Sequence, residues 1–307
     1  MELKPLLISR LFNTFAALNF FVMQNFFVKS HGLGNDYIVL NQYEISFELT
    51  PKAIQKICDV HYGIGSDGIL LKVPSYKANF GLRILNPDGS EAEKSGNGLR
   101  IFAKYLYDSK FSKEKIFTIE TPGGVVRAEI IEEVKKKAKT IKVDMGKANF
   151  ISAEIPVNCA KEECLDEVLN LEYKDYIINC VSVGNPHCVI LKDELDEKEI
   201  KQFGTYIENH PMFPNRINVQ FAKVISPNEV EVLIWERGAG WTLASGSSSC
   251  AVASVMVKKG LTDRKLSVKM PGGTLQIEID EAWNIKMTGE VREIATGVLS
   301  AELIEEL

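Results

Sequence analysis

Apolar and polar residues alternate along several short segments of the chain. The stretches TIKVDMG (residues 140–146) and EVEVLIWE (residues 229–236) change character at every second position, and glycine or proline stands close to their ends. A period of two is typical of strands that bury one face. The pattern therefore predicts a protein built largely from short strands.

Two segments show the longer period of a helix instead. Apolar residues return at helical spacing after Ser95 and again after Ser245. The positions are Leu99, Ile101, Phe102, Tyr105 and Leu106 in the first segment, and Ala251, Val252, Val255 and Met256 in the second. Lys258, Lys259 and Gly260 then provide cations and a C′ glycine, which favour a helix end. We predict one helix after each serine.

Three motifs occur twice in the same order. GNDYIVL at residue 34, SGNGLRIFAKYL at residue 95 and PGGVVRAEI at residue 122 correspond to GNPHCVIL at 184, SGSSSCAVASVMV at 245 and PGGTLQIEI at 271. The intervals are 61 and 27 residues in the first set and 61 and 26 in the second. Matched motifs at matched spacing indicate two halves of one design.

These patterns predict an α+β protein with two pseudo-symmetric domains and a crevice between them. A chain of 307 residues is long enough for two cores. We place the N-terminal domain at residues 23–147 and the C-terminal domain at residues 148–307. Small-molecule sites favour such interdomain crevices.

Residues 1–22 are treated as an N-terminal extension. Their apolar run LFNTFAALNFFV follows Lys4 and Arg10 and is similar to a signal-peptide core, but it is too short and interrupted to span a bilayer. The alternative is a misplaced start, because MQNFFVKSHGLGND from Met23 leads directly into a strand. We favour the misplaced start.

The composition of the chain indicates which classes of binding partner to expect and which to exclude. The formal charge is −5 and no basic cluster is visible, which argues against nucleic acid. The six cysteines include no CxxC pair and no histidine at metal-ligand spacing, so we predict no metal site and a reducing, cytoplasmic location. Cys159 and Cys164 lie in a charged stretch, and a disulfide between exposed thiols is the alternative. We expect no membrane partner.

Ser95 and Ser245 each precede a predicted helix in a glycine- or serine-rich loop. The first amides of a helix lack acceptors, so such a position binds anions and lowers the pKa of an acidic group. Helix capping alone is the alternative for these serines. If the halves face each other, the two serines flank one ligand, an arrangement that suits chemistry on two faces of one carbon.

The chain resembles the diaminopimelate epimerase family over residues 25–307. The matching stretches are HGLGNDYIVL, GIGSDGILL, NPDGSEAEKSGNGLR, TPGGVVRAEI, GNPHCV, FPNRINVQF and ERGAGWTLASGSSSCA. The resemblance implies two domains, each a mixed sheet or barrel around a central helix, with the active site in the cleft. It also implies an isomerase without a cofactor, often a homodimer. The implied reaction inverts the α-carbon of diaminopimelate between its LL and meso forms, in lysine and peptidoglycan synthesis.

The resemblance also implies the residues of the site. The family's two acid–base cysteines fall at Ser95 and Ser245, the implied catalytic positions. The implied binding residues for the amino and carboxylate groups are Asn35, Asn86, Asn185, Asn218, Glu236 and Arg237. Gly96, Asn97, Gly246 and Ser247 would cradle the reacting α-carboxylate. Taken singly, each has a structural alternative as a turn residue, a cap or an ion-pair partner.

Serine at both cysteine positions is the main departure from the family. A thiol titrates near 8.5 and an alkyl hydroxyl nearer ~15.7, so an alkoxide at neutral pH costs on the order of 8–10 kcal/mol more. Gly68 stands where many members have glutamine, and Trp241 where glutamate is usual. The family's usual Cys-Gly-Thr-Gly is Ser-Gly-Ser-Ser in the second loop, followed by Ser249, and Leu99 and Ile101 differ from the small or thiol residues expected after the first GNG. Because the changes extend over both loops, they favour divergence over a minimal Cys-to-Ser substitution.

Three functions follow as hypotheses. The first is an amino-acid epimerase of the diaminopimelate type acting on a small-molecule amino acid. The second is a diverged isomerase or dehydratase on another amino acid, with Ser245 donating a proton. The third is a ligand-binding homologue that kept the pocket and lost the acid–base pair.

Overall fold

The computed structural model describes residues 25–172 and 174–307, so the extension at residues 1–22 lies outside the described part. The first half contains β1 (Phe26–Gly32), β2 (Asn35–Asn41), α2 (Pro51–Cys58), β3 (Ile69–Val73), β4 (Phe80–Leu85), β5 (Glu91–Ala92), α3 (Gly96–Asp108), β6 (Ile116–Thr121), β7 (Gly124–Val134) and β8 (Lys137–Lys147). The second half contains β9 (Glu167–Asn170), β10 (Asp175–Ser182), β11 (Pro186–Leu191), α4 (Glu197–Glu208), β12 (Asn218–Ser226), β13 (Glu229–Glu236), β14 (Gly240–Thr242), α5 (Gly246–Lys258), β15 (Lys265–Met270), β16 (Gly273–Ile279) and β17 (Asn284–Glu290). The chain ends with β18 (Arg292–Val298) and α6 (Ala301–Glu305).

The two halves share one strand topology. In the first half, β1 pairs antiparallel with β2, β2 parallel with β3, and β4 parallel with β6. In the second half, the equivalent pairs are β10 with β11, β11 with β12, and β13 with β15, in the same orientations. The short strands β5 and β14 form hairpins with β4 and β13 directly before α3 and α5. The repeated motifs therefore occupy equivalent places in an α+β fold, as predicted.

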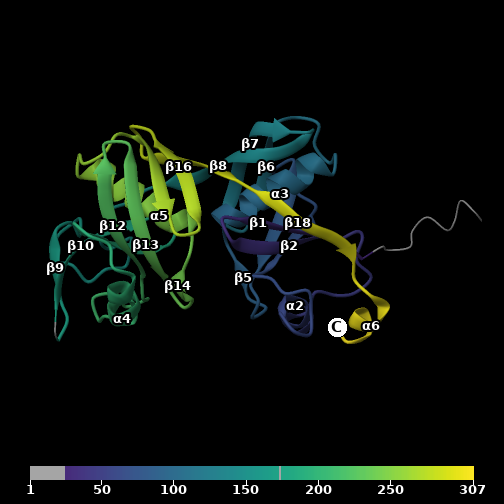
Figure 1. Cartoon of the computed structure of the whole chain (residues 1–307), viewed down its shortest axis with the longest axis horizontal. Coiled ribbons are helices and arrows are strands. Elements are labelled where there is room, and N and C mark those ends of the chain that lie inside the picture. The colour runs from purple at the N-terminus through teal and green to yellow at the C-terminus, as the bar shows by residue number, and fades with distance from the viewer. Residues whose placement is uncertain (1–24, 173) are drawn as a thin grey trace, which may run out of the picture.

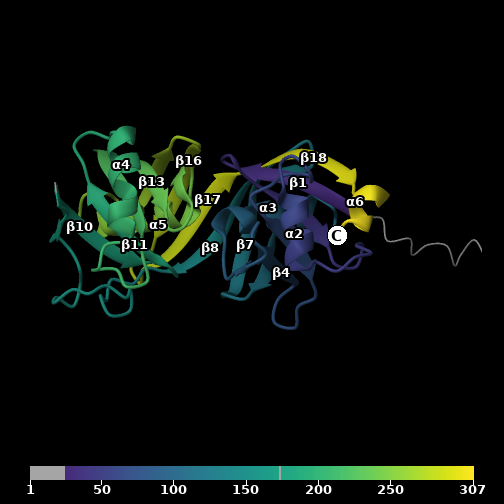
Figure 2. The same cartoon turned by 90° about the horizontal axis from the view of Figure 1, so that it is seen from below.

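The halves are joined by their last strands. β8 pairs antiparallel with β17, and both run between the two lobes in Figures 1 and 2. Beyond this ladder the chain crosses over, because β9 adds to β10 in the second half and β18 adds to β1 in the first. Thus β9, which follows the last strand of the first half, completes the sheet of the second half, and β18, which follows the last strand of the second half, completes the sheet of the first.

The end of the chain lies with the first half. α6 lies near α2 (Figure 2), and Leu299, Leu303 and Ile304 belong to the apolar cluster around α2. Lys56 forms an ion pair with Glu306 at 2.5 Å. The division at residues 147/148 stays a prediction, and the structure adds that the final strand and helix pack with the N-terminal half.

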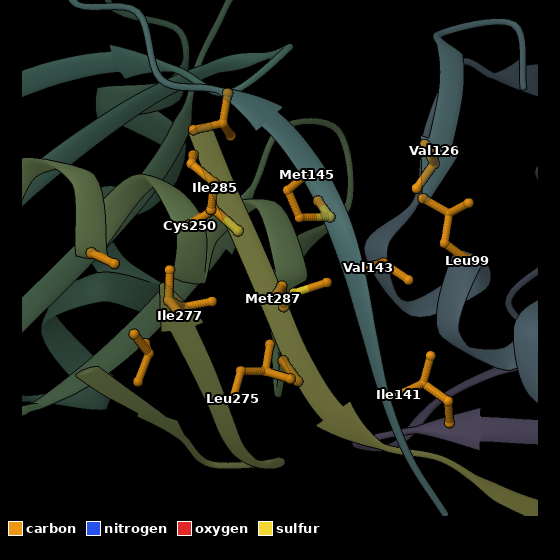
Figure 3. Packing of buried hydrophobic residues seen from close by; sticks show 14 of the residues in the cluster. Leu99, Val126, Ile141, Val143, Met145, Cys250, Leu275, Ile277, Ile285 and Met287 are labelled. Carbon is orange, nitrogen blue, oxygen red and sulfur yellow. The ribbon is translucent and has the colours of Figure 1, made fainter. Parts of the chain in front are cut away.

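A buried helix forms the centre of each half. Leu99, Phe102 and Leu106 on α3 are fully buried, and so are Val252 and Val255 on α5. The two helices lie on either side of the β8–β17 ladder, which contributes Val143, Met145, Ile285 and Met287 to one continuous core (Figure 3). α5 is buried on every face, its residues Ser248, Ser249 and Ser254 included, and such a helix is stable only when it is surrounded.

The helix ends follow from local chemistry. The Ser95 and Ser245 side chains cap α3 and α5 by accepting from Gly98 N (3.1 Å) and Ser248 N (3.4 Å). At the other end of α5, Lys259 is the C-cap and Gly260 takes a φ of +67°, which glycine adopts without steric cost. Both predicted helix starts and the predicted end of the second helix are therefore confirmed.

All six cysteines are free. Cys164, whose charged surroundings made exposure an open alternative, is fully buried, because it packs into the apolar cluster of the second half. Within the described residues, no group of His, Cys, Asp and Glu side chains is arranged to hold a metal. None of the helices in residues 25–172 and 174–307 is long and apolar enough to cross a membrane.

Candidate active site

The N-termini of α3 and α5 meet across the β8–β17 ladder. A Cβ atom built on Gly246 would lie only 3.5 Å from Gly96 Cα. Met287 packs beneath both, since its Cε would lie 2.5 Å from a Cβ at Gly96 and 3.1 Å from one at Gly246. Figure 3 shows Met145 and Met287 between the helix that carries Leu99 and the helix that carries Cys250. The two serine loops therefore converge.

Helix amides without acceptors gather at this meeting point. The first amides of α3 (Gly96, Asn97) and of α5 (Gly246, Ser247) precede the first helical hydrogen bonds, so they have no acceptor within their own helix. Each helix also places the positive end of its dipole here. Two helix N-termini that converge on one point form a site for a carboxylate or another small anion.

Ser245 lies beside a carboxylate whose proton affinity is increased. Its Oγ donates to Glu236 Oε2 at 3.2 Å and lies 3.4 Å from Ser247 Oγ. Burial raises the pKa of the Glu236 carboxyl, and hydrogen bonds from Ser245 and Thr242 offset part of that rise. Glu236 is thus placed to take a proton from Ser245.

Ser95 lies beside a phenol. Its Oγ and the Tyr37 hydroxyl are 3.3 Å apart, and either oxygen can be the donor. Burial raises the pKa of Tyr37 to about 12, so the phenol is protonated at neutral pH. The two serines therefore have partners of opposite kind: a proton acceptor beside Ser245 and a proton donor beside Ser95.

A chain of amide hydrogen bonds links the first half's polar residues. Asn97 Nδ2 donates to Asn35 Oδ1 at 3.1 Å, and Asn35 Nδ2 donates to Asp67 Oδ2 at 2.8 Å. Arg100 Nη2 donates to Asn97 Oδ1 at 2.6 Å. Each amide is held at its oxygen and through an N–H, so its orientation is set before any ligand binds.

The second half's polar residues form a separate network. Asn218 Nδ2 donates to Pro186 O at 2.8 Å, and its Oδ1 accepts from Arg237 N at 3.0 Å. Asn185 Oδ1 lies 2.9 Å from His187 Nε2. Burial lowers the pKa of His187 to about 3, so this histidine is neutral and acts as a structural partner of Asn185.

Two of the expected binding residues make their side-chain hydrogen bonds away from the two serine loops. Asn86 hydrogen-bonds to Ser90 Oγ at 2.9 Å within its own turn. The exposed Arg237 side chain donates to Asn215 O at 3.1 Å, so its guanidinium remains at the surface. Both stay predictions as ligand contacts.

The structure gives a steric reason for glycine at position 68 and shows what Trp241 contacts. Gly68 has a φ of +154°, and a Cβ there would lie 2.6 Å from Leu85 O and 2.8 Å from the Tyr37 ring. The position has no room for a side chain while Tyr37 packs as it does. Trp241 packs against the second half's core, and Lys201 on α4 lies 4.8 Å from its ring centroid.

Sequence reasoning missed three residues of the site. Tyr37 stands within the quoted GNDYIVL motif, Asp67 within GIGSDGILL and Arg100 within SGNGLRIFAKYL. Their presence in matched motifs was a signal, but motif membership does not say which side chains touch the serines.

The fold is shared with solved structures that are named as a racemase and an epimerase. A probable proline racemase from Agrobacterium radiobacter superposes with a TM-score of 0.67 at 14% identity, covering 90% of this chain and 93% of that one. A hydroxyproline epimerase from Agrobacterium vitis superposes with a TM-score of 0.66, also at 14% identity, covering 89% and 90%. These likenesses define the class of fold.

Sequence comparison identifies the family. The family model described as diaminopimelate epimerase matches residues 27–151 and 179–294. Diaminopimelate epimerase 2 of Nostoc sp. is 50% identical over 278 residues, which cover 90% of this chain and 96% of that protein. The diaminopimelate epimerase of Acetivibrio thermocellus is 41% identical over 272 residues, covering 88% and 97%. The chain belongs to the diaminopimelate epimerase family, whose members are isomerases.

Proposed function

We propose that the protein interconverts the LL and meso forms of diaminopimelate without a cofactor, as a step in lysine and peptidoglycan synthesis. The observation that carries the proposal is the convergence of the two serine loops, which come so close that a Cβ atom added to Gly246 would lie 3.5 Å from Gly96 Cα. An α-carboxylate at the paired helix N-termini places the α-carbon between Ser95 and Ser245.

The site stabilises the charge that develops during the reaction. When the α-proton leaves, negative charge spreads onto the α-carboxylate, where the amides at Gly96, Asn97, Gly246 and Ser247 donate. These donors are fixed by the helices before substrate arrives, so they need not reorganise during the step. The side chains at Asn35, Asn86, Asn185, Asn218, Glu236 and Arg237 are proposed to hold the ligand's amino and carboxylate groups.

The proton path runs through hydrogen-bonded pairs rather than through free alkoxides. On one face, Ser245 Oγ takes the α-proton as its own proton passes to Glu236, which leaves a neutral carboxyl and a carbanion. On the other face, Ser95 donates its proton to the α-carbon and Tyr37 replaces it, which leaves a phenolate. Solvent then carries the proton from Glu236 back to Tyr37, and the reverse direction uses the same steps backwards.

Isotope exchange tests the proposal. The protein is incubated with LL-diaminopimelate in D₂O, and deuterium at the α-carbon and the LL-to-meso ratio are measured. We expect incorporation together with inversion, loss of inversion in both Ser95→Ala and Ser245→Ala, and loss of deuterium exchange in the variant that lacks the serine removing the α-proton of the LL form. Turnover of a different amino acid alone would instead support the diverged isomerase or dehydratase.

A ligand-binding role is the second candidate, because both serine hydroxyls already serve as helix caps. A protein with this role binds LL-diaminopimelate saturably but exchanges no α-proton. The same D₂O incubation, combined with calorimetric titration, separates the two candidates.

Glu236 gives the reaction a characteristic dependence on pH. Its carboxylate form accepts the proton, and burial raises its pKa, so kcat/KM should fall as pH drops through a value above the ordinary 4.3 of glutamate. In Glu236→Gln we expect kcat/KM to decrease by about 10²-fold and the acid limb to disappear. A variant profile that retains the limb would assign it to another group.

The proposal also includes a homodimeric state and a cytoplasmic location. A homodimer is supported by β18, whose residues are largely exposed and include the half-exposed apolar side chains of Ile294 and Val298. Sedimentation at micromolar concentration tests it. Six free thiols support a reducing cytoplasmic location.

A further inference from the structure

Arg100 is a buried cation without a buried anion. Its side chain, one turn into α3, is 0% exposed, and none of the salt bridges among the described residues includes it. Burial lowers its pKa to about 10, which still leaves the guanidinium protonated at neutral pH. Its neighbour Cys250 is a neutral thiol there, because burial raises the pKa of Cys250 to about 12.

The guanidinium lies in a slot under the helix N-terminus. Nη1 donates to Gly96 O at 3.1 Å and contacts Met287 Sδ at 3.4 Å, while Nη2 donates to Asn97 Oδ1 at 2.6 Å. Nε has no acceptor among the described residues. Glycines make the slot, since a Cβ at Gly32 or Gly289 would approach the guanidinium to 3.2 or 3.1 Å.

An unpaired buried charge is costly for a fold, so its retention calls for a compensating anion or hydrogen bonds to its donors. Here the donors point to the peptide that begins α3. Gly96 C=O accepts from Arg100, and the N–H of that same peptide group belongs to Asn97, one of the free amides of the site. Hydrogen bonding at the carbonyl strengthens the N–H of the same peptide as a donor.

We propose that Arg100 is a positioning residue that supplies the missing counter-charge for the ligand's carboxylate without touching it. Its charge lies under the paired helix N-termini, it polarises the Gly96–Asn97 peptide, and it fixes the orientation of the Asn97 amide. The inference deepens the proposed function, because it assigns the anionic group of the ligand to the α3 side of the site.

Met287 provides a matched test, because its sulfur contacts Nη1 and its length is close to those of glutamate and glutamine. Met287→Glu gives Arg100 an internal anion, whereas Met287→Gln is the neutral control of similar shape. Sodium acetate and LL-diaminopimelate are titrated separately into ¹⁵N-labelled protein, and the backbone amide signals of Asn97 and Ser247 are followed. Denaturant unfolding reports the stability of each variant.

We expect Met287→Glu to weaken acetate binding by about 10-fold or more relative to Met287→Gln, while its stability equals or exceeds that of the control. The Asn97 amide proton of the free protein should move upfield in Met287→Glu and in Arg100→Gln. Equal acetate affinity in the two Met287 variants would overturn the inference, even if Arg100→Gln fails to fold.

The two probes keep this inference separate from the proposed function. The protein could bind acetate with an affinity that depends on the charge at Arg100 and yet not bind diaminopimelate. That result would contradict diaminopimelate as the substrate but would support the role proposed for Arg100. Arg100→Lys separates charge from geometry: retained acetate affinity with an altered Asn97 signal is the expected result. Affinity lost as fully as in Arg100→Gln would contradict a role for charge.

Discussion

The double variant Ser95→Cys/Ser245→Cys is expected to epimerise LL-diaminopimelate at least about 10³-fold faster than the protein itself. A thiol is roughly seven pKa units more acidic than an alkyl hydroxyl, and a helix N-terminus lowers a thiol's pKa further. Both serines occupy such a position as N-caps of α3 and α5. A coupled assay or proton NMR of the LL and meso forms measures the gain.

Ser247→Cys is the matched control for this gain. Ser247 stands on the same loop, with its Oγ 3.4 Å from Ser245 Oγ, but its counterpart in the repeat is Asn97 and the proposal uses only its backbone amide. A thiol there should leave the rate within about 3-fold of the unmodified protein. If the double variant is no faster than this control, the site has diverged in more than its two reacting atoms, and the epimerase proposal loses its main support.

Restoring the family's usual glutamine at position 68 is expected to damage the protein. Gly68→Gln should lower the free energy of unfolding by about 3 kcal/mol, because the new Cβ meets a backbone oxygen and the φ is unfavourable for any side chain. The distances are 2.6 Å to Leu85 O and 2.8 Å to Tyr37 Cε1, at a φ of +154°. Displacement of Tyr37 should also reduce α-proton exchange.

Gly34→Gln provides the comparison, because Gly34 also has a positive φ (+91°) but no heavy atom lies within 4 Å of a Cβ there. Gly34→Gln should lower the free energy of unfolding only by the backbone strain, about 1 kcal/mol. Urea unfolding of both variants gives the difference. Equal urea midpoints for the two variants would show that Tyr37 and Leu85 move aside at little cost. Glycine at position 68 would then have another cause.

Local elements were predictable because their signals lie within a few residues. The alternation in residues 229–236 predicted β13, and the helical spacing after Ser95 predicted α3. The cap hydroxyl and the amide that it accepts from are three residues apart in both helices. The repeat added a longer-range statement, since equal motifs at equal spacing require equal folds.

The partners of the serines were beyond such reasoning. Tyr37 and Ser95 are separated by 58 positions, and Arg100 and Met287 by 187. No periodicity connects residues so distant, because their contact depends on strand order and on the packing of two halves. The same limit applies to the return of β18 to β1, which the repeat pattern assigned to the other half.

The sequence by itself therefore determined the strand and helix types, the two-fold repeat, the serines at two helix starts and the family, because each of these is written in neighbouring residues or in whole motifs. Only the tertiary structure decided what the serines face. The β8–β17 ladder packs between the two helices, whose N-termini lie close together, and the surrounding burial turns Glu236 into a better proton acceptor and leaves Arg100 charged without a counter-ion. Burial and proximity are properties of the packed molecule, since both depend on segments that come together only after folding.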